Sequence, residues 1–149
     1  EVERTIFDIS QSYEEYEYLL TIPGFGPYVS AVVLGAIGNP YRFENASQVI
    51  RLAGLDLNAH RSGKTSATAV PVVSKKGKAD LRYALYQAAL IASSLTIHFR
   101  EYYHRLLDGR QKEKGIRTKM RVKLATKLLV IAWTLMKKKE TFDPVYLKT

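Results

Sequence analysis

The spacing of apolar residues in the second half of the chain constrains its fold more than any other feature. From Asp80 onward the apolar positions step by three or four, the period of a helix with one buried face. They are Leu81, Leu85, Ala88, Ala92, Leu95, Phe99, Tyr102 and Leu106, then Met120, Leu124, Leu128, Ile131 and Leu135. We expect a helix over about 80–108, either continuous or broken near Thr96, and a last helix over about 117–137.

Helix breakers divide the first half into shorter helices. A helix is expected over residues 13–20, followed by a turn rich in Pro and Gly at 21–27. Pro27 suits the first position of a second helix, which runs to about residue 37. Residues 45–48 resemble a capping box with Asn as the cap, and they open a third helix that ends near Gly54.

Residues 57–79 interrupt the helical pattern with a polar stretch of small residues. We expect a long exposed loop with room for one short hairpin, because a loop of this length in a compact domain is usually functional or disordered. The sequence therefore predicts an all-α fold. It combines a helix-hairpin-helix element, long C-terminal helices and one extended polar loop at about 57–79.

Composition excludes several classes of protein. The 149 residues are 46% hydrophobic, enough for a buried core and against wholesale disorder. The chain has no cysteine, so disulfides and thiolate metal sites are excluded. No apolar run reaches the roughly 18 residues that span a bilayer, and the first residues do not resemble a signal peptide. Because the first residue is not Met, we expect the chain to begin partway through a gene.

Acidic and histidine side chains do not cluster at the spacing of metal ligands. The scattered residues are Asp56, Asp80, Glu101, Asp108, His60, His98 and His104. We therefore expect no metal site in this chain, and we place the last two histidines at the surface. Tyr102 and Tyr103 could suggest a recombinase nucleophile, but their place in an apolar periodic stretch favours packing.

Two basic segments hold the excess positive charge. The net charge is +9, while residues 60–82 carry +5 and residues 110–139 carry +10. Such clustering suits a polyphosphate partner, since each neutralised phosphate releases counterions. The alternative is a solvated surface that only keeps the protein soluble.

The Pro-Gly-Phe-Gly-Pro run at residues 23–27 looks like the turn of a helix-hairpin-helix element. Glycines at 24 and 26 leave no side chain between the backbone and a ligand. The amide N–H groups that open the next helix can bind a phosphate oxygen, while Phe25 turns inward to hold the turn. A tight helix–helix turn without a ligand is the alternative.

The polar loop contains a hydroxyl between cations, Arg61-Ser62-Gly63-Lys64. A serine can attack a phosphodiester if a base takes its proton and cations stabilise the crowded phosphorus. His60 could supply the base, although a Ser-Gly pair in an exposed loop more often has no catalytic role. The run is no Walker loop, because it lacks the earlier glycine.

Several segments in order resemble the C-terminal transposase domain of the Piv/MooV DNA invertases and the insertion sequence one-ten (110/116/902) transposases. The resemblance covers about residues 18–144. Its segments are Leu20 to Pro27, Leu34 to Asn39, Arg42 to Ala46, Leu52 to Leu55, Arg61 to Lys64, Ser74 to Arg82, and Tyr102-Tyr103.

This resemblance implies more than the residues show by themselves. Full-length members carry an N-terminal RuvC-like nuclease domain that binds Mg²⁺ through acidic residues, and several use a guide RNA and act as homo-oligomers. Their C-terminal domain supplies a serine that attacks DNA. By motif position that serine is Ser62, with Ser66 and Ser74 as fallbacks.

We therefore predict a DNA-binding domain of a transposase, inactive by itself, in the cytoplasm of a prokaryote. Its parts are a helical linker tail at 1–18, the transposase domain at 19–144 and a tail at 145–149. The alternative is a non-catalytic helix-hairpin-helix DNA-binding module, and a scaffold for an acidic protein is a third reading. The candidate nucleic-acid contacts are Gly24, Gly26, Tyr28, Arg61, Lys64, Lys75, Lys76, Lys78, Arg82, Lys119, Lys123 and Lys127.

Overall fold

The computed structural model describes residues 2, 4, 13–58, 72–73 and 77–148 of the chain. Its elements are α2 (Glu14–Leu20), α3 (Pro27–Ile37), the 3-10 helix η1 (Pro40–Arg42), α4 (Ala46–Leu52), β1 (Leu57–Asn58), β2 (Val72–Val73), α5 (Ala79–Leu95), α6 (Ile97–Leu107), α7 (Ile116–Lys138) and the 3-10 helix η3 (Pro144–Lys148). The all-α prediction is confirmed. In the described residues β structure amounts to one antiparallel pair of two-residue strands.

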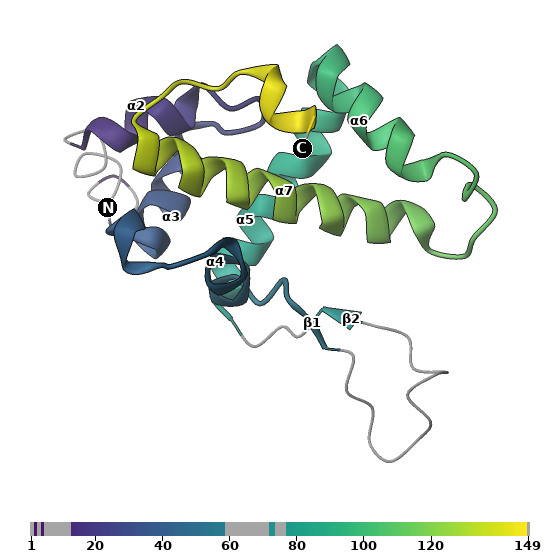
Figure 1. Cartoon of the computed structure of the whole chain (residues 1–149), viewed down its shortest axis with the longest axis horizontal. Helices are drawn as coiled ribbons and strands as arrows, with labels where there is room; N and C mark the ends of the chain where they lie inside the picture. Colours follow the sequence, from purple (N-terminus) through teal and green to yellow (C-terminus); the bar gives the residue numbers. More distant parts are fainter. Residues whose placement is uncertain (1, 3, 5–12, 59–71, 74–76, 149) are drawn as a thin grey trace.

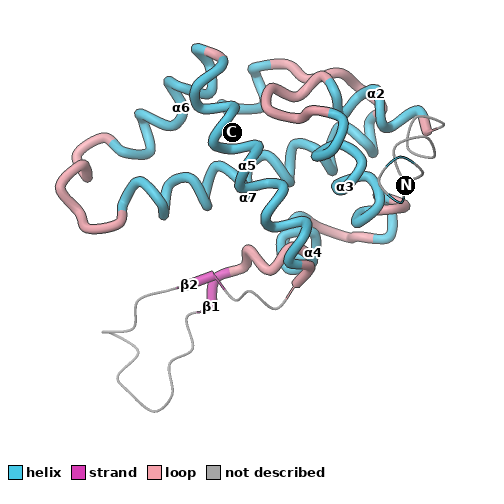
Figure 2. The backbone as a smooth tube through the Cα atoms, turned by 180° about the vertical axis from the view of Figure 1, so that it is seen from behind, coloured by secondary structure: helices cyan, strands magenta, loops and turns pink. Residues whose placement is uncertain are grey.

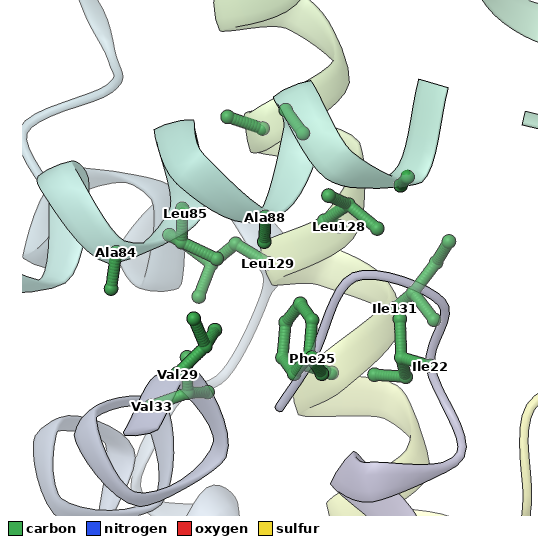
Figure 3. Close-up of a cluster of buried hydrophobic side chains, with 14 of the residues drawn as sticks. Ile22, Phe25, Val29, Val33, Ala84, Leu85, Ala88, Leu128, Leu129 and Ile131 are labelled. Carbon is green, nitrogen blue, oxygen red and sulfur yellow. The ribbon is translucent and has the colours of Figure 1, made fainter. Parts of the chain in front are cut away.

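Helices α5 and α7 pack against each other at the centre of the molecule (Figure 1). Helices α2, α4 and α6 also contact α7, and α3 lies mainly on α5. Figure 3 shows where α3, α5 and α7 meet, with Phe25 from the α2–α3 turn near Leu128 of α7 and Ala88 of α5. Apolar residues far apart in the sequence thus form one core.

Local chemistry at the helix ends explains why the elements start and stop where they do. Pro27 is the first residue of α3, and Asn45 caps α4 by accepting the Gln48 N–H at 3.1 Å. Thr96 lies between α5 and α6, and its hydroxyl accepts the Phe99 N–H at 3.3 Å. Of the two alternatives for residues 80–108, the structure contains the helix broken near Thr96.

Two short 3-10 helices were not predicted, and both close over the core. The Trp133 indole N–H donates to the Pro40 carbonyl at 2.8 Å, which ties η1 to α7. Before η3, the Phe142 ring stacks on Phe99 with ring centres 5.5 Å apart. Leu147 in η3 is buried, so residues 144–148 pack on the helical body although we named 145–149 a tail.

One stretch of the surface has no formal charge. No Asp, Glu, Lys or Arg occurs from Tyr83 to Phe99, in a chain of which a quarter is charged. Tyr83 and four large aliphatic side chains of this stretch are exposed: Leu90, Ile91, Leu95 and Ile97. Among the described residues no helix is both long and apolar enough to cross a membrane.

Candidate nucleic-acid interface

The α2–α3 turn fits tightly against α5. Gly24 has φ +91°, a backbone conformation that favours glycine, and a Cβ added there would lie 2.5 Å from the Ala88 carbonyl oxygen. Phe25 beside it is 4% exposed, as expected for a residue that turns inward. Gly24 therefore serves the close approach of the turn to α5, and Figure 3 shows Phe25 directed at the same cluster.

Gly26 lies on the open side of the same turn. It is exposed, and a Cβ added there would meet nothing within 4 Å. Gly26 is the N-cap of α3 and has no side chain to accept the first amide N–H groups of that helix. Tyr28, in the first turn, is 54% exposed. The start of α3 thus combines N–H groups that no side chain caps, an open approach and an exposed ring.

Three lysines follow one side of α7 in its first half. Lys119, Lys123 and Lys127 are four residues apart, so they form a stripe about 12 Å long. The first two are exposed and Lys127 is half-buried. Burial lowers the pKa of Lys127 from its ordinary value of 10.5, and a phosphate beside it would oppose that change.

The same basic segment holds exposed residues that our site prediction left out. Arg110, Lys112, Lys114 and Arg117 lie in the loop before α7 and in its first turn. Arg110 is paired with Glu113, with Nε and Oε2 2.8 Å apart. The excess charge of residues 110–139 was the available signal, but it does not say which side chains remain in solvent.

Lys78 and Arg82 lie at the start of α5, next to the end of α4. Lys78 is exposed, while its backbone N–H donates to the Leu52 carbonyl at 2.8 Å. Arg82 is half-buried, and its Nη1 donates to the Ala53 carbonyl at 3.2 Å. One of its donors is therefore engaged by the protein itself.

The remaining site predictions fall on residues that the structure does not describe. These are Arg61, Ser62, Lys64, Ser66, Ser74, Lys75 and Lys76. The short hairpin for which the loop had room is present at its base, where Leu57 pairs with Val73 and Asn58 with Val72. The loop thus leaves and re-enters the described structure at one place, near α4 (Figures 1 and 2).

Other candidate chemistry is weak in the part of the chain that the structure describes. No group of three or more acidic or histidine residues there could hold a metal ion. His98 and His104 are exposed, as expected. Tyr103 is 6% exposed and donates its hydroxyl to the Arg117 carbonyl at 3.2 Å, so it packs between α6 and α7.

The described candidates fall into three groups on three elements. Gly24 and Gly26 lie in the α2–α3 turn with Tyr28 just after it in α3, Lys78 and Arg82 lie at the start of α5, and the three lysines lie on α7. Helix α5 contacts both α3 and α7, so all three groups are built on one core. The uncharged stretch from Tyr83 to Phe99 offers no cation to a polyanion.

Comparisons with known proteins show which family and which relatives the chain resembles. The profile of the family described as "Transposase IS116/IS110/IS902 family" matches residues 16–104. A pilin gene-inverting protein of Moraxella bovis is 32% identical over 129 residues, which cover 84% of this chain and 38% of that protein. The pilin gene-inverting protein of Moraxella lacunata is 31% identical with the same coverage. The chain therefore spans well under half the length of these relatives.

Proposed function

Because the chain belongs to the transposase IS116/IS110/IS902 family, we propose that it is the nucleic-acid-binding domain of a transposase that recombines DNA. The two Moraxella relatives are named pilin gene-inverting proteins, and the inversion of a gene is a DNA rearrangement, which supports the proposal. Given the family, the observation that carries the proposal is the stripe of Lys119, Lys123 and Lys127 on α7.

The chemistry of the proposed contacts is that of backbone recognition. Lys119, Lys123 and Lys127 would neutralise successive phosphates, and each such contact releases counterions. The amide N–H groups at the start of α3 would bind a further phosphate oxygen beside Gly26. Tyr28 offers a ring on which a base or sugar can pack. Such contacts position the nucleic acid without reading its sequence.

For the chemical step we propose Ser62 as the nucleophile, with Ser66 and Ser74 as the fallbacks. The serine Oγ would form a bond to a DNA phosphorus, and one bond from phosphorus to a deoxyribose oxygen would break. The proton of the serine goes to a base, and the departing oxygen takes up a proton. Arg61 and Lys64, adjacent in sequence, would stabilise the charge on phosphorus.

The other requirements of the complete enzyme belong to the same proposal. The described residues of this chain offer no cluster that fits Mg²⁺, so we assign that ion to acidic residues elsewhere in the recombinase. A guide RNA and assembly into a homo-oligomer are further parts of the proposal. We also propose that the protein acts in the cytoplasm of a prokaryote.

The binding proposal is tested with this chain and labelled duplex DNA at several salt concentrations. We expect affinity to fall as salt rises, and Lys119→Ala with Lys123→Ala to reduce the slope of log K against log salt by about 1.8. The matched control is Lys138→Ala with Lys148→Ala, two exposed lysines of which one ends α7 and the other lies in η3, and it should leave the slope nearly unchanged. Affinity that does not change with salt contradicts the proposal.

The role of the serine is tested in a complete recombinase that contains this chain. Ser62→Ala should abolish recombination and the covalent serine–DNA product while DNA binding persists. Ser66→Ala and Ser74→Ala are the comparison variants. Unchanged recombination in all three would favour the alternative, a non-catalytic DNA-binding module.

A further inference from the structure

The second leg of the polar loop returns to the helical body along the end of α4. The backbone N–H of Lys78 donates to the Leu52 carbonyl at 2.8 Å, and Leu52 is the last residue of α4. The first leg leaves from the same place, since β1 begins only a few residues after α4 ends. Both legs are also paired with each other through β1 and β2.

Gly77 makes this return possible through its lack of a side chain. A Cβ added at Gly77 would overlap the Leu52 carbonyl oxygen and the Gly54 nitrogen, and it would lie 2.7 Å from the Ala53 carbonyl carbon. All three are backbone atoms, which cannot rotate away as a side chain can. Glycine is thus required at this position by close packing of backbone on backbone.

Arg82 completes the attachment from α5. Its guanidinium donates to the Ala53 carbonyl at 3.2 Å, across 29 residues of sequence. Ala53 is the C-cap of α4, so the bond satisfies a carbonyl at the end of that helix. Three neighbouring backbone positions at the end of α4 and just after it, 52 to 54, therefore contact the segment from Gly77 to Arg82.

We propose that Gly77 and Arg82 are positioning residues, which fix the base of the loop that carries Ser62. The inference rests on the proposed function, because it gives a role to a loop whose serine is the proposed nucleophile. As a general rule, bringing the two ends of a chain segment together restricts the conformations open to it. A nucleophile must be held near its target, and misplacement by about 1 Å can cost about 100-fold in rate.

The test uses the absence of cysteine from the natural chain. Spin labels are attached at Ser62→Cys and at Glu101→Cys, an exposed position on α6, and pulsed electron paramagnetic resonance gives their distance distribution. We expect Gly77→Ala and Arg82→Met to shift and widen this distribution. Arg82→Lys keeps a charged donor for the Ala53 carbonyl, so its distance distribution should lie between that of Arg82→Met and that of the labelled chain with Arg82.

Controls separate positioning from general stability. Gly35→Ala is the matched glycine variant, since a Cβ there meets nothing within 4 Å, and Arg51→Met removes an exposed arginine from α4. Both should leave the distribution of the 62–101 pair unchanged. A second label pair at Glu17 and Glu101, both exposed, reports whether the helical body is intact.

The proposal is overturned if the 62–101 distance distribution of Arg82→Met equals that of the labelled chain with Arg82. It is overturned equally if the 17–101 pair changes to the same extent, because the role of Arg82 would then be to stabilise the fold. If Gly77→Ala does not fold, Arg82→Met and Arg82→Lys still decide the question. The measurement is made without nucleic acid, so a failure of the binding proposal does not alter its outcome.

Discussion

Gly24 and Gly26 stand two residues apart and serve different purposes. Gly24 has a positive φ and lies against the backbone of α5, whereas Gly26 has φ −85° and open space around it. The first glycine is therefore a requirement of the fold. The second leaves the start of α3 accessible, so it belongs to the proposed phosphate contact.

The two glycines give a matched test. Gly24→Ala should lower the free energy of unfolding by about 2 kcal/mol or more, because the new methyl meets the Ala88 carbonyl and φ is unfavourable. Gly26→Ala should cost well under about 1 kcal/mol, since only a weak cap preference is lost. Urea unfolding followed by circular dichroism measures both. Equal losses in the two variants would show that the turn does not depend on Gly24 in this way.

Tyr146 supplies a prediction on pH. Its hydroxyl donates to Glu140 Oε2 at 2.6 Å, and this bond, together with burial and the charges of Glu140 and Asp143, raises the pKa of Tyr146 to about 12 from 10.0. The bond stabilises the fold fully below pH 10, and that contribution is lost as pH rises from 10 toward 12. The absorbance titration of the chain minus that of Tyr146→Phe should inflect near 12, and Glu140→Gln should move the inflection back toward 10. An inflection at the same pH in Glu140→Gln contradicts the assignment.

At the scale of elements, α5 and α6 are two helices because of Thr96. The residue has extended backbone angles, φ −121° and ψ 146°, and its side chain caps α6. The bend turns α6 back so that it packs on both α5 and α7. Tyr103 and Phe99 thereby reach the core from α6.

Removing this cap should weaken the element that it starts. Thr96→Ala should lower the free energy of unfolding by about 1 kcal/mol, because the Phe99 N–H loses its acceptor. Thr96→Ser retains the hydroxyl and is the control. Chemical denaturation of the two variants measures the difference, and equal stability of Thr96→Ala and Thr96→Ser would contradict the capping role.

Over the whole molecule, the last residues of the described chain close the core. The Phe142 N–H donates to the Thr21 hydroxyl at 2.8 Å, and Leu147 is buried. The C-terminal segment thus contacts both the α2–α3 turn and α6. The segment is too short to show the apolar periodicity of a helix. Its packing therefore depends on the surface that the preceding helices present.

Leu147 and Val145 test this closure. Leu147 is 4% exposed, so Leu147→Ala should lower the free energy of unfolding by about 2 kcal/mol or more. Val145 is 53% exposed, so Val145→Ala should change it by less than about 0.5 kcal/mol. Thermal and urea unfolding give both values. A small effect at Leu147 would mean that the core is complete without the last residues.

Sequence reasoning predicted what local chemistry determines. Pro27, Asn45 and the apolar period of α5 and α7 indicate helices that the structure contains, within one or two residues of the expected ends. The close approaches at Gly24 and Gly77 could not be predicted, because they depend on where a distant helix passes. The hydrogen bond from Arg82 to the Ala53 carbonyl also depends on where a distant helix passes. From the sequence alone, Arg82 was predicted only as a nucleic-acid contact.

Helix α7 has a consequence for mechanics. Its first turns expose Lys119 and Lys123, while Ile116 and Met120 on the same turns are buried and the Arg117 carbonyl accepts a hydrogen bond from Tyr103 of α6. From Leu124 to Met136 the helix packs among the other helices. The exposed lysines therefore stand on a helix that is attached to the body along its length, so a pull on them moves the whole body.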